Sequence, residues 1–347
     1  MINITNITYE FLLAYVNEDS FLTRIGTRWW MDSIYLFFVC PLSLIGIILN
    51  LLSLFVLYKM NEKKYFIFKI LKVYCINSVL ICIIAFFTFY VGSPRYIGFR
   101  LDYIARTYYC VIINYIGITF YLVGNVLDII ISIERSSIFL PRLNKIQKLE
   151  PFSAFFALII ICHIVNVPSL FWYYVKNDKQ MLEELVHSYL TSTFYGRCGR
   201  WFLFGNFPSY ISNILIRDVL TLFLEVVFTL STLYYFIKFQ TKKAILLNYD
   251  QNDVIVKTKK EESRMSSMSL YLTTTSILSH TAVLLTSVSL LIYESAFATT
   301  FLILIAIIAI SFKHSSNFFI FYFFNKKFKT ALLNYFNYRK TNLETVC

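Results

Sequence analysis

Charged residues are scarce in this chain. Only 15% of its 347 residues are Asp, Glu, Lys or Arg, whereas 58% are hydrophobic and the mean hydropathy is +0.63. A soluble chain of this length needs far more charge on its surface, so the composition predicts a membrane protein. The net charge of +12 then favours basic cytoplasmic loops over a nucleic-acid partner, because Lys and Arg are concentrated on that side of membrane proteins.

Glycine, proline and catalytic motifs are scarce as well. The chain has 9 Gly and 6 Pro and no repeat between its halves, whereas transporters typically combine internal repeats with helices broken by these residues. The sequence contains no Gly-rich phosphate loop, no His-Glu-x-x-His, no Cys-x-x-Cys and no nucleophile elbow. We therefore expect neither an enzyme nor a metal or cofactor site.

Long apolar runs are what the chain has in abundance. Each is long enough to cross a ~30 Å hydrocarbon core, and backbone hydrogen bonding in lipid requires such runs to be helices. The prediction is an all-α membrane protein with a seven-transmembrane helix bundle over residues 33–324. An extracellular segment (1–32) precedes the bundle, and a short amphipathic cytoplasmic helix and tail (325–347) follow it. The seven runs are Ser33–Tyr58, Ile67–Tyr90, Cys110–Ile133, Phe152–Tyr174, Tyr210–Ile237, Leu270–Ile292 and Phe297–Phe324.

The distribution of basic residues predicts the orientation. With the C-terminus in the cytoplasm, 21 of the 32 Lys and Arg residues lie inside and 9 outside, as the positive-inside rule requires. Two glycosylation sequons, which start at Asn3 and Asn6, are both in the segment predicted to be extracellular. We therefore expect a multi-pass protein of the plasma membrane.

Two of the seven cysteines fall on the predicted outer side. Cys110 is at the start of the third run and Cys198 is in the long second outer loop. Because that side is oxidising, we predict a disulfide between them. The others are expected to pack within helices, apart from the last residue, and they are Cys40, Cys75, Cys82, Cys162 and Cys347.

The spacing between Cys110 and Arg135 is 25 residues. At about 100° per residue this spacing returns to the starting face of a helix after roughly seven turns, or ~37 Å. One helix would therefore carry a cysteine at one membrane surface and an arginine at the other. A receptor that senses outside and signals inside could use such a helix.

Four short motifs accompany this spacing, and together with the seven runs they resemble the rhodopsin-like class of G-protein-coupled receptors. The resemblance extends over about Gly46 to Phe336 and is of the kind found among divergent invertebrate peptide receptors and chemoreceptors. The motifs are Gly46-Ile-Ile-Leu-Asn50, Glu134-Arg135-Ser136, Asn317-Phe318-Phe319-Ile320-Phe321 and Asn325-Lys326-Lys327-Phe328-Lys329.

The chain also departs from the pattern of that family. Ser279-His280-Thr281 stands in place of Trp-x-Pro in the sixth span, and the fifth span lacks its proline. In the second span Asn77-Ser78 replaces the usual aspartate, and in the seventh Phe318 and Phe321 replace the proline and tyrosine. An altered switching mechanism is therefore expected.

The resemblance implies a function. The protein would convert binding of an extracellular ligand into activation of a heterotrimeric G protein. A neuropeptide is the favoured ligand, and arrestin is a further partner. A chemosensory receptor for a small molecule is an alternative, and a membrane transporter or channel is an alternative from a different class. Glu134 would hold the Arg135 guanidinium until activation frees it, with Asn317, Phe321 and Asn325 in the same switch. The simpler interpretation of Arg135 is a helix-end arginine that reaches the inner interface.

Five ionisable groups are deep in the runs and should face the bundle and pair, because an unpaired charge in the membrane is costly. We predict that Lys313 takes the place of the sodium ion of the resembled family, with Asp128, Asn50 and Asn77 as candidate partners. A purely structural ion pair is the alternative. The five groups are Asp128, Arg217, Asp218, Glu225 and Lys313.

The candidate ligand-binding residues are less specific. Arg217 and Asp218 are neighbours, so at most one can point straight into a cavity, and an interhelical pair is the alternative. Gly117 stands where amine receptors carry an aspartate, so an amine ligand is not expected. His163 and His280 are expected to be packed or hydrogen-bonded interior residues. The full set of ligand candidates is Gly117, Tyr121, Arg197, Arg217 and Asp218.

Overall fold

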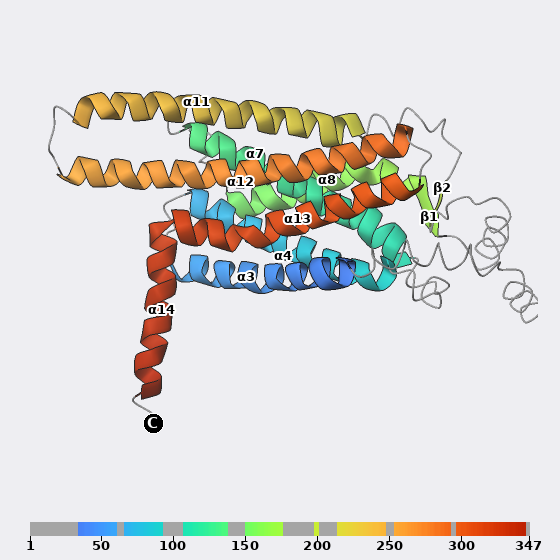
Figure 1. Cartoon of the computed structure of the whole chain (residues 1–347), viewed down its shortest axis with the longest axis horizontal. Helices are drawn as coiled ribbons and strands as arrows, with labels where there is room; N and C mark the ends of the chain where they lie inside the picture. The colour runs from blue at the N-terminus through green and yellow to red at the C-terminus, as the bar shows by residue number, and fades with distance from the viewer. Residues whose placement is uncertain are drawn as a thin grey trace, which may run out of the picture.

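The computed structural model describes residues 34–60, 66–92, 107–137, 150–175, 198–200, 214–247, 253–292 and 296–344. Almost all of these residues are helical. Seven long helices pack against one another, and α14 (Lys326–Glu344) leaves the bundle at a steep angle (Figure 1). The seven are α3 (Cys40–Lys59), α4 (Phe66–Gly92), α7 (Ile118–Ser137), α8 (Pro151–Trp172), α11 (Thr221–Leu247), α12 (Asp253–Ile292) and α13 (Ala296–Phe324).

Three of these helices continue a short π-helical segment without a break. The segments are η1 (Tyr35–Val39) before α3, η2 (Tyr108–Gly117) before α7 and η4 (Leu215–Leu220) before α11. The helical segment formed by η2 and α7 therefore carries Cys110 near its first residue and Arg135 near its last.

Five helices of the described part are long and apolar enough to cross a membrane, which fits a multi-pass membrane protein. The apolar part of α8 is shorter, over Pro151–Val167, and α12 begins with the charged stretch Asp253–Arg264. Seven helices are therefore present where seven runs were predicted, and five of them qualify as spans. The five spans are Leu36–Lys59, Phe66–Phe87, Val111–Glu134, Arg217–Tyr235 and Phe301–Phe324.

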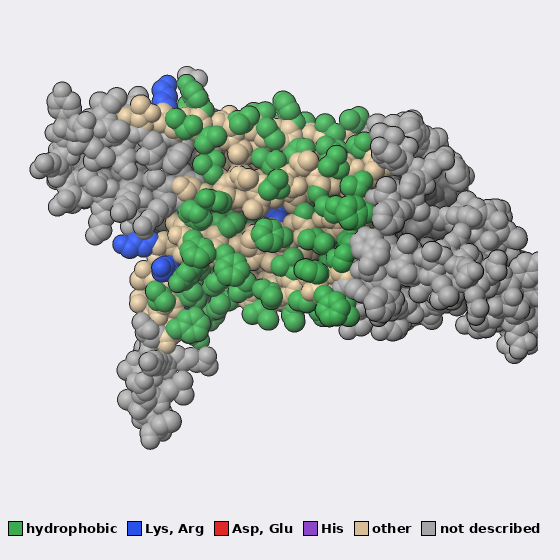
Figure 2. Space-filling view, in the orientation of Figure 1, with side chains coloured by type: hydrophobic (Ala, Val, Ile, Leu, Met, Phe, Trp, Pro, Cys, Tyr) green, Lys and Arg blue, Asp and Glu red, His purple; other side chains and the backbone are tan. Residues whose placement is uncertain are grey.

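The outer surface of the bundle is apolar. Figure 2 shows hydrophobic side chains over the middle of the visible face, with Lys and Arg gathered at the end from which α14 departs. Large apolar side chains stay exposed on several helices, among them Phe37, Phe156, Leu278 and Phe323. Such a continuous exposed apolar belt is expected for a surface that faces lipid.

Two short strands are the exception to the all-α prediction. Strand β1 (Tyr173–Val175) pairs in antiparallel fashion with β2 (Cys198–Arg200), with Val175 opposite Cys198. Strand β1 also contacts η2, the segment that contains Cys110. The side chains of Cys110 and Cys198 lie outside the described residues, so the disulfide stays a prediction.

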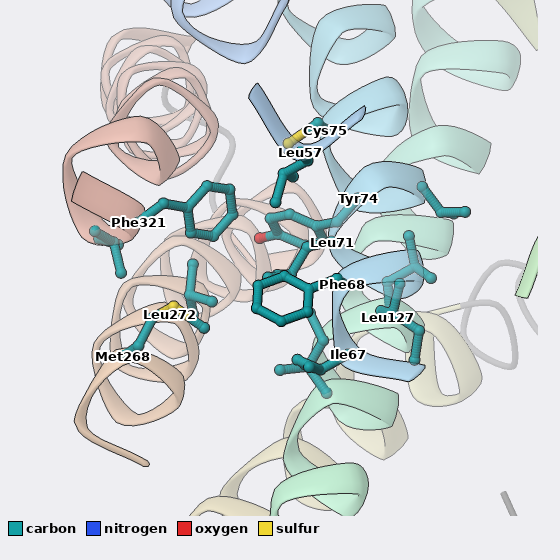
Figure 3. Close-up of a cluster of buried hydrophobic side chains, with 14 of the residues drawn as sticks. Leu57, Ile67, Phe68, Leu71, Tyr74, Cys75, Leu127, Met268, Leu272 and Phe321 are labelled. Carbon is teal, nitrogen blue, oxygen red and sulfur yellow. The ribbon is translucent and has the colours of Figure 1, made fainter. Parts of the chain in front are cut away.

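A cluster of buried apolar side chains joins the helices toward the end that carries α14. Figure 3 shows Leu71 and Tyr74 of α4 facing Leu272 of α12 and Phe321 of α13. Tyr74, Leu272 and Phe321 are fully buried. Because lipid is itself apolar, close packing rather than the exclusion of water holds such a cluster together.

Gly46 allows α3 to approach α4 and α13 closely. A Cβ atom at this position would lie 2.5 Å from Ser315 Oγ and 2.7 Å from Cys82 Sγ. Both distances are well inside van der Waals contact, and Ser315 Oγ also donates a hydrogen bond to the Leu42 carbonyl. Small residues at such crossings are typical of helices packed in membranes.

We therefore expect Gly46→Ala to lower the free energy of unfolding by about 1–3 kcal/mol, the usual cost of overpacking. Thermal unfolding of the purified protein in detergent measures the effect. Gly46→Ala combined with Ser315→Ala should recover part of the loss, because the nearest clashing atom is removed. Ile48→Ala, at an exposed position of the same helix, is the matched control. Wild-type stability of the Gly46→Ala protein would contradict the close approach.

Candidate functional site: a buried polar network

Lys313 of α13 forms an ion pair with Asp128 of α7. Its Nζ lies 2.7 Å from Asp128 Oδ2, and the side chains are 1% and 0% exposed, respectively. Nζ also donates to Ser276 Oγ at 2.8 Å and to Asn125 Oδ1 at 3.3 Å. Ser276 in turn donates to Asp128 Oδ2 at 2.9 Å. The three donors of the ammonium group therefore each have an acceptor, which a buried lysine requires.

The other two candidate partners of Lys313 bind elsewhere. Asn50 Nδ2 donates to the carbonyls of Gly46 and His314, each at 2.7 Å, and Asn77 Nδ2 donates to the Phe120 carbonyl at 3.1 Å. Of the three candidate partners of Lys313, Asp128 is thus the one that binds it, whereas Asn50 and Asn77 have other partners. Lys313 and His314 are neighbours whose directions diverge by about 100°, so the Lys313 side chain turns toward α7 and the His314 ring toward Ser78 of α4.

A second polar cluster forms around His314. Ser78 Oγ lies 3.0 Å from His314 Nδ1 and accepts a hydrogen bond from Asn317 Nδ2 at 3.1 Å. Asn317 Nδ2 also donates to Asn50 Oδ1 at 3.5 Å. Asn317, which was expected to belong to the switch, thus links α13 to α3 and α4, and all four side chains are buried.

Arg217 and Asp218 pair with each other. Arg217 Nε and Nη2 donate to the two oxygens of Asp218 at 2.7 and 2.6 Å, and Ser287 of α12 donates to Asp218 Oδ2 at 3.1 Å. Their side chains are 11% and 0% exposed, respectively. The two charges therefore neutralise each other, and Ser287 connects the pair to α12. The ion pair thus joins two adjacent residues of η4.

The other ligand candidates differ in their surroundings. Tyr121 is buried, with its ring centroid 6.0 Å from Lys313 Nζ and 5.8 Å from the His280 ring. A Cβ at Gly117 would lie 3.3 Å from both the Ile112 carbonyl oxygen and a methyl group of Ile84, so this glycine is at a tight packing position. Arg197, Asn3 and Asn6 lie outside the described residues.

His280 and Glu225 form a contact that was not predicted from the sequence. His280 Nδ1 of α12 lies 3.4 Å from Glu225 Oε2 of α11, and both side chains are 0% exposed. His280 Nε2 lies 3.2 Å from Thr221 Oγ1, one turn earlier on α11. The only signal in the sequence was a carboxylate and a histidine within apolar runs, which did not indicate that they meet.

The structure describes the side chains of only some of the switch residues predicted for the cytoplasmic end. Glu134 is buried, whereas the Arg135 side chain lies outside the described residues, so their contact stays a prediction. Phe321 is fully buried with its ring centroid 5.8 Å from that of Phe328. Asn325 Oδ1 accepts a hydrogen bond from the Phe328 backbone N–H at 3.1 Å. Asn325 therefore caps the first turn of α14, which is a local structural role.

Helix α12 is thus held to its neighbours by buried polar contacts at three levels. Ser287 reaches Asp218, His280 reaches Glu225, and Ser276 reaches both Asp128 and Lys313. Among the described residues no group of three or more His, Cys, Asp or Glu side chains could hold a metal ion. Any outward movement of α12 has to break or exchange these contacts, so the network can couple a change near Asp218 to the Asp128–Lys313 pair at the middle of the helix.

Comparison with known proteins gives no relative. No protein-family model matches the chain, and no curated protein is detectably similar to it.

Proposed function

We propose that this protein is a divergent rhodopsin-like G-protein-coupled receptor of the plasma membrane. It binds an extracellular ligand, for which a neuropeptide is the favoured candidate, and activates a heterotrimeric G protein. Its N-terminus is extracellular and its C-terminus cytoplasmic, and seven helices cross the membrane.

The observation that carries the proposal is the helical segment formed by η2 and α7. Its backbone carries Cys110 near the end that contacts β1 and Glu134-Arg135 at the opposite end. Helix α12, which packs on α7, is held there by Ser276 through Asp128. A ligand that disturbs the polar contacts of α12 would therefore also change the packing of α12 against α7, the helix that carries Arg135.

Two further features support the proposal. Figure 1 shows α11 and α12 extending past the other helices at the end where α14 departs. The first turns of α12 carry several lysines between Lys257 and Lys260, and basic residues at this end agree with a cytoplasmic location. An opening between α12 and α7 there would give a G protein access to the Arg135 guanidinium, whose planar donors suit a peptide carboxylate or carbonyl.

The test compares wild type with Arg135→Ala in cells that express a G-protein activation reporter. We expect a peptide from an invertebrate neuropeptide library to stimulate the wild type, and Arg135→Ala to reduce this response to background at equal surface expression. Arg135→Lys should recover little, because an ammonium lacks the planar fork of the guanidinium.

An unimpaired response of Arg135→Ala would contradict the assigned role of this residue. No G-protein activation by any peptide, together with ion or solute flux across the membrane, would instead support the transporter or channel alternative. Activation by a small volatile or metabolite, but by no peptide, would support the chemosensory alternative.

A further inference from the structure

The hydrogen bonds around His280 define where its protons must be. The Thr221 hydroxyl donates its only proton to the Arg217 carbonyl, so toward His280 Nε2 it can only accept. On the other side, Nδ1 faces Oε2 of Glu225, and an ionised carboxylate accepts only. With Glu225 ionised, both ring nitrogens face acceptors, and a ring that donates from both nitrogens is an imidazolium.

The charges of the surrounding groups lead to the same result. Arg217 is paired with Asp218, and Lys313 with Asp128. Glu225 is then left with His280 as its basic partner among the described residues. Because Glu225 is fully buried, a carboxylate without a counter-charge would be costly at this position.

Within the described part of the chain, no other group packed against His280 supplies the missing positive charge. Helix α7 contributes the phenol of Tyr121, which is neutral at physiological pH, and the Asp128 carboxylate. Helix α13 contributes Lys313, and η4 contributes Arg217 and Asp218, all of them already paired. The charge balance of this interior therefore depends on the proton that His280 holds.

We propose that Glu225 and His280 form a buried proton-binding site that ties α12 to α11. A proton taken from water forms the second N–H bond of the ring and makes the contact with Glu225 an ion pair. When the proton leaves, a neutral ring faces an uncompensated carboxylate, and the attraction between α12 and α11 at this point weakens. The proton-binding site does not depend on the proposed function, but its consequence for signalling rests on that function. If the protein is a receptor, loss of the proton should release α12 and raise basal activity.

Solid-state NMR of the full chain in lipid bilayers tests the site directly, because imidazole ¹⁵N shifts distinguish an imidazolium from a neutral ring. Of the four histidines, only His280 is followed by threonine. Labelling with uniformly ¹³C,¹⁵N-labelled histidine and ¹⁵N-threonine therefore identifies the His280 ring in the wild type, through its carbonyl carbon bonded to the Thr281 nitrogen, without any substitution. Spectra are recorded between about pH 5 and pH 9, which covers the ordinary titration range of histidine around its pKa of about 6.5.

We expect His280 to carry protons on both ring nitrogens at neutral pH. Glu225→Gln should convert it to a neutral ring, because the negative partner is gone. His163→Gln is the matched control: the His163 ring lies 3.2 Å from the Tyr115 hydroxyl, apart from the Glu225–His280 pair, so its removal should leave the His280 signals unchanged. A neutral His280 ring in the wild type at neutral pH, or an imidazolium that persists in Glu225→Gln, would overturn the proposal.

A functional measurement separates this proposal from the proposed function. Basal G-protein activation should rise with external pH in the wild type and lose this dependence in His280→Gln. An imidazolium at His280 without any G-protein activation would leave the proton site standing and count against the receptor. G-protein activation without an imidazolium at His280 would support the receptor and overturn the proton site.

Discussion

Replacing Lys313 by Met is expected to remove most folded protein from the cell surface. The substitution leaves Asp128 as a buried carboxylate without its cation, in a position where it is 0% exposed. Breaking a buried ion pair from one side costs about 3–5 kcal/mol, a large part of the total stability of a typical protein. Surface expression and thermal unfolding of the purified protein both measure the loss.

A second substitution should reverse the effect. In the double variant Lys313→Met with Asp128→Asn neither charge of this pair is left, and the new amide can still accept the hydrogen bond that Ser276 now donates to Asp128. Because replacing a whole buried pair by neutral groups is often neutral or stabilising, we expect the double variant to fold better than Lys313→Met. Lys329→Met is the matched control, since this lysine is exposed on α14. A double variant no better than Lys313→Met would show that the ammonium is needed for more than neutralising Asp128.

The double variant also separates the two interpretations of Lys313. If the pair is purely structural, a folded double variant should signal like the wild type. If Lys313 substitutes for a bound sodium ion in the switch, the folded double variant should have altered basal activity. A response of the wild-type protein that depends strongly on sodium would contradict the substitution hypothesis.

Removing the Phe328 side chain is expected to release α14 from the bundle. Phe328 is fully buried, with its ring centroid 5.8 Å from the rings of both Phe318 and Phe321. Leu332, one turn further along α14, is buried as well. Truncation of a buried phenylalanine to alanine costs about 3–5 kcal/mol, which leaves Leu332 and the contact of the Tyr335 ring with Phe55 as the main apolar contacts that hold this helix in its steep orientation.

Hydrogen exchange of the purified protein measures this release. In Phe328→Ala the amides of α14 should exchange faster, whereas those of α4 and α13 should keep their protection, because the bundle has many other contacts. Phe336→Ala is the matched control on the same helix, since this ring is 50% exposed. Unchanged protection of α14 in Phe328→Ala would show that the capping hydrogen bond from Asn325 and the lipid surface suffice to hold it.

Several features of the protein could be predicted from the sequence because their causes are local. Long apolar runs form helices wherever lipid leaves the backbone no other hydrogen-bonding partner, and seven helices occur at the seven runs. The amphipathic segment 325–347 was predicted to begin with a helix, and α14 spans Lys326–Glu344, with Asn325 accepting a hydrogen bond at its first turn. The short β1–β2 pair was missed, because three-residue strands leave no periodicity to detect.

The sequence also required that buried charges have partners, but it did not determine which ones. Asn50 and Asn77 were as plausible as Asp128 for Lys313, and Arg217 could have paired across helices rather than with Asp218. Glu225 and His280 are 55 residues apart, and no pattern connected them.

The sequence by itself thus determined the composition, the helices and the need to compensate charge in the interior, because these follow from the chain and its solvent. Only the tertiary structure decided the rotation of each helix and therefore which polar groups meet. In a membrane the lipid-facing and the buried side chains are both apolar, so the hydrophobic pattern that orients a helix in a soluble protein is largely lost. Close contacts such as that of Gly46 with Ser315 set the rotation instead, and they exist only once the helices have packed.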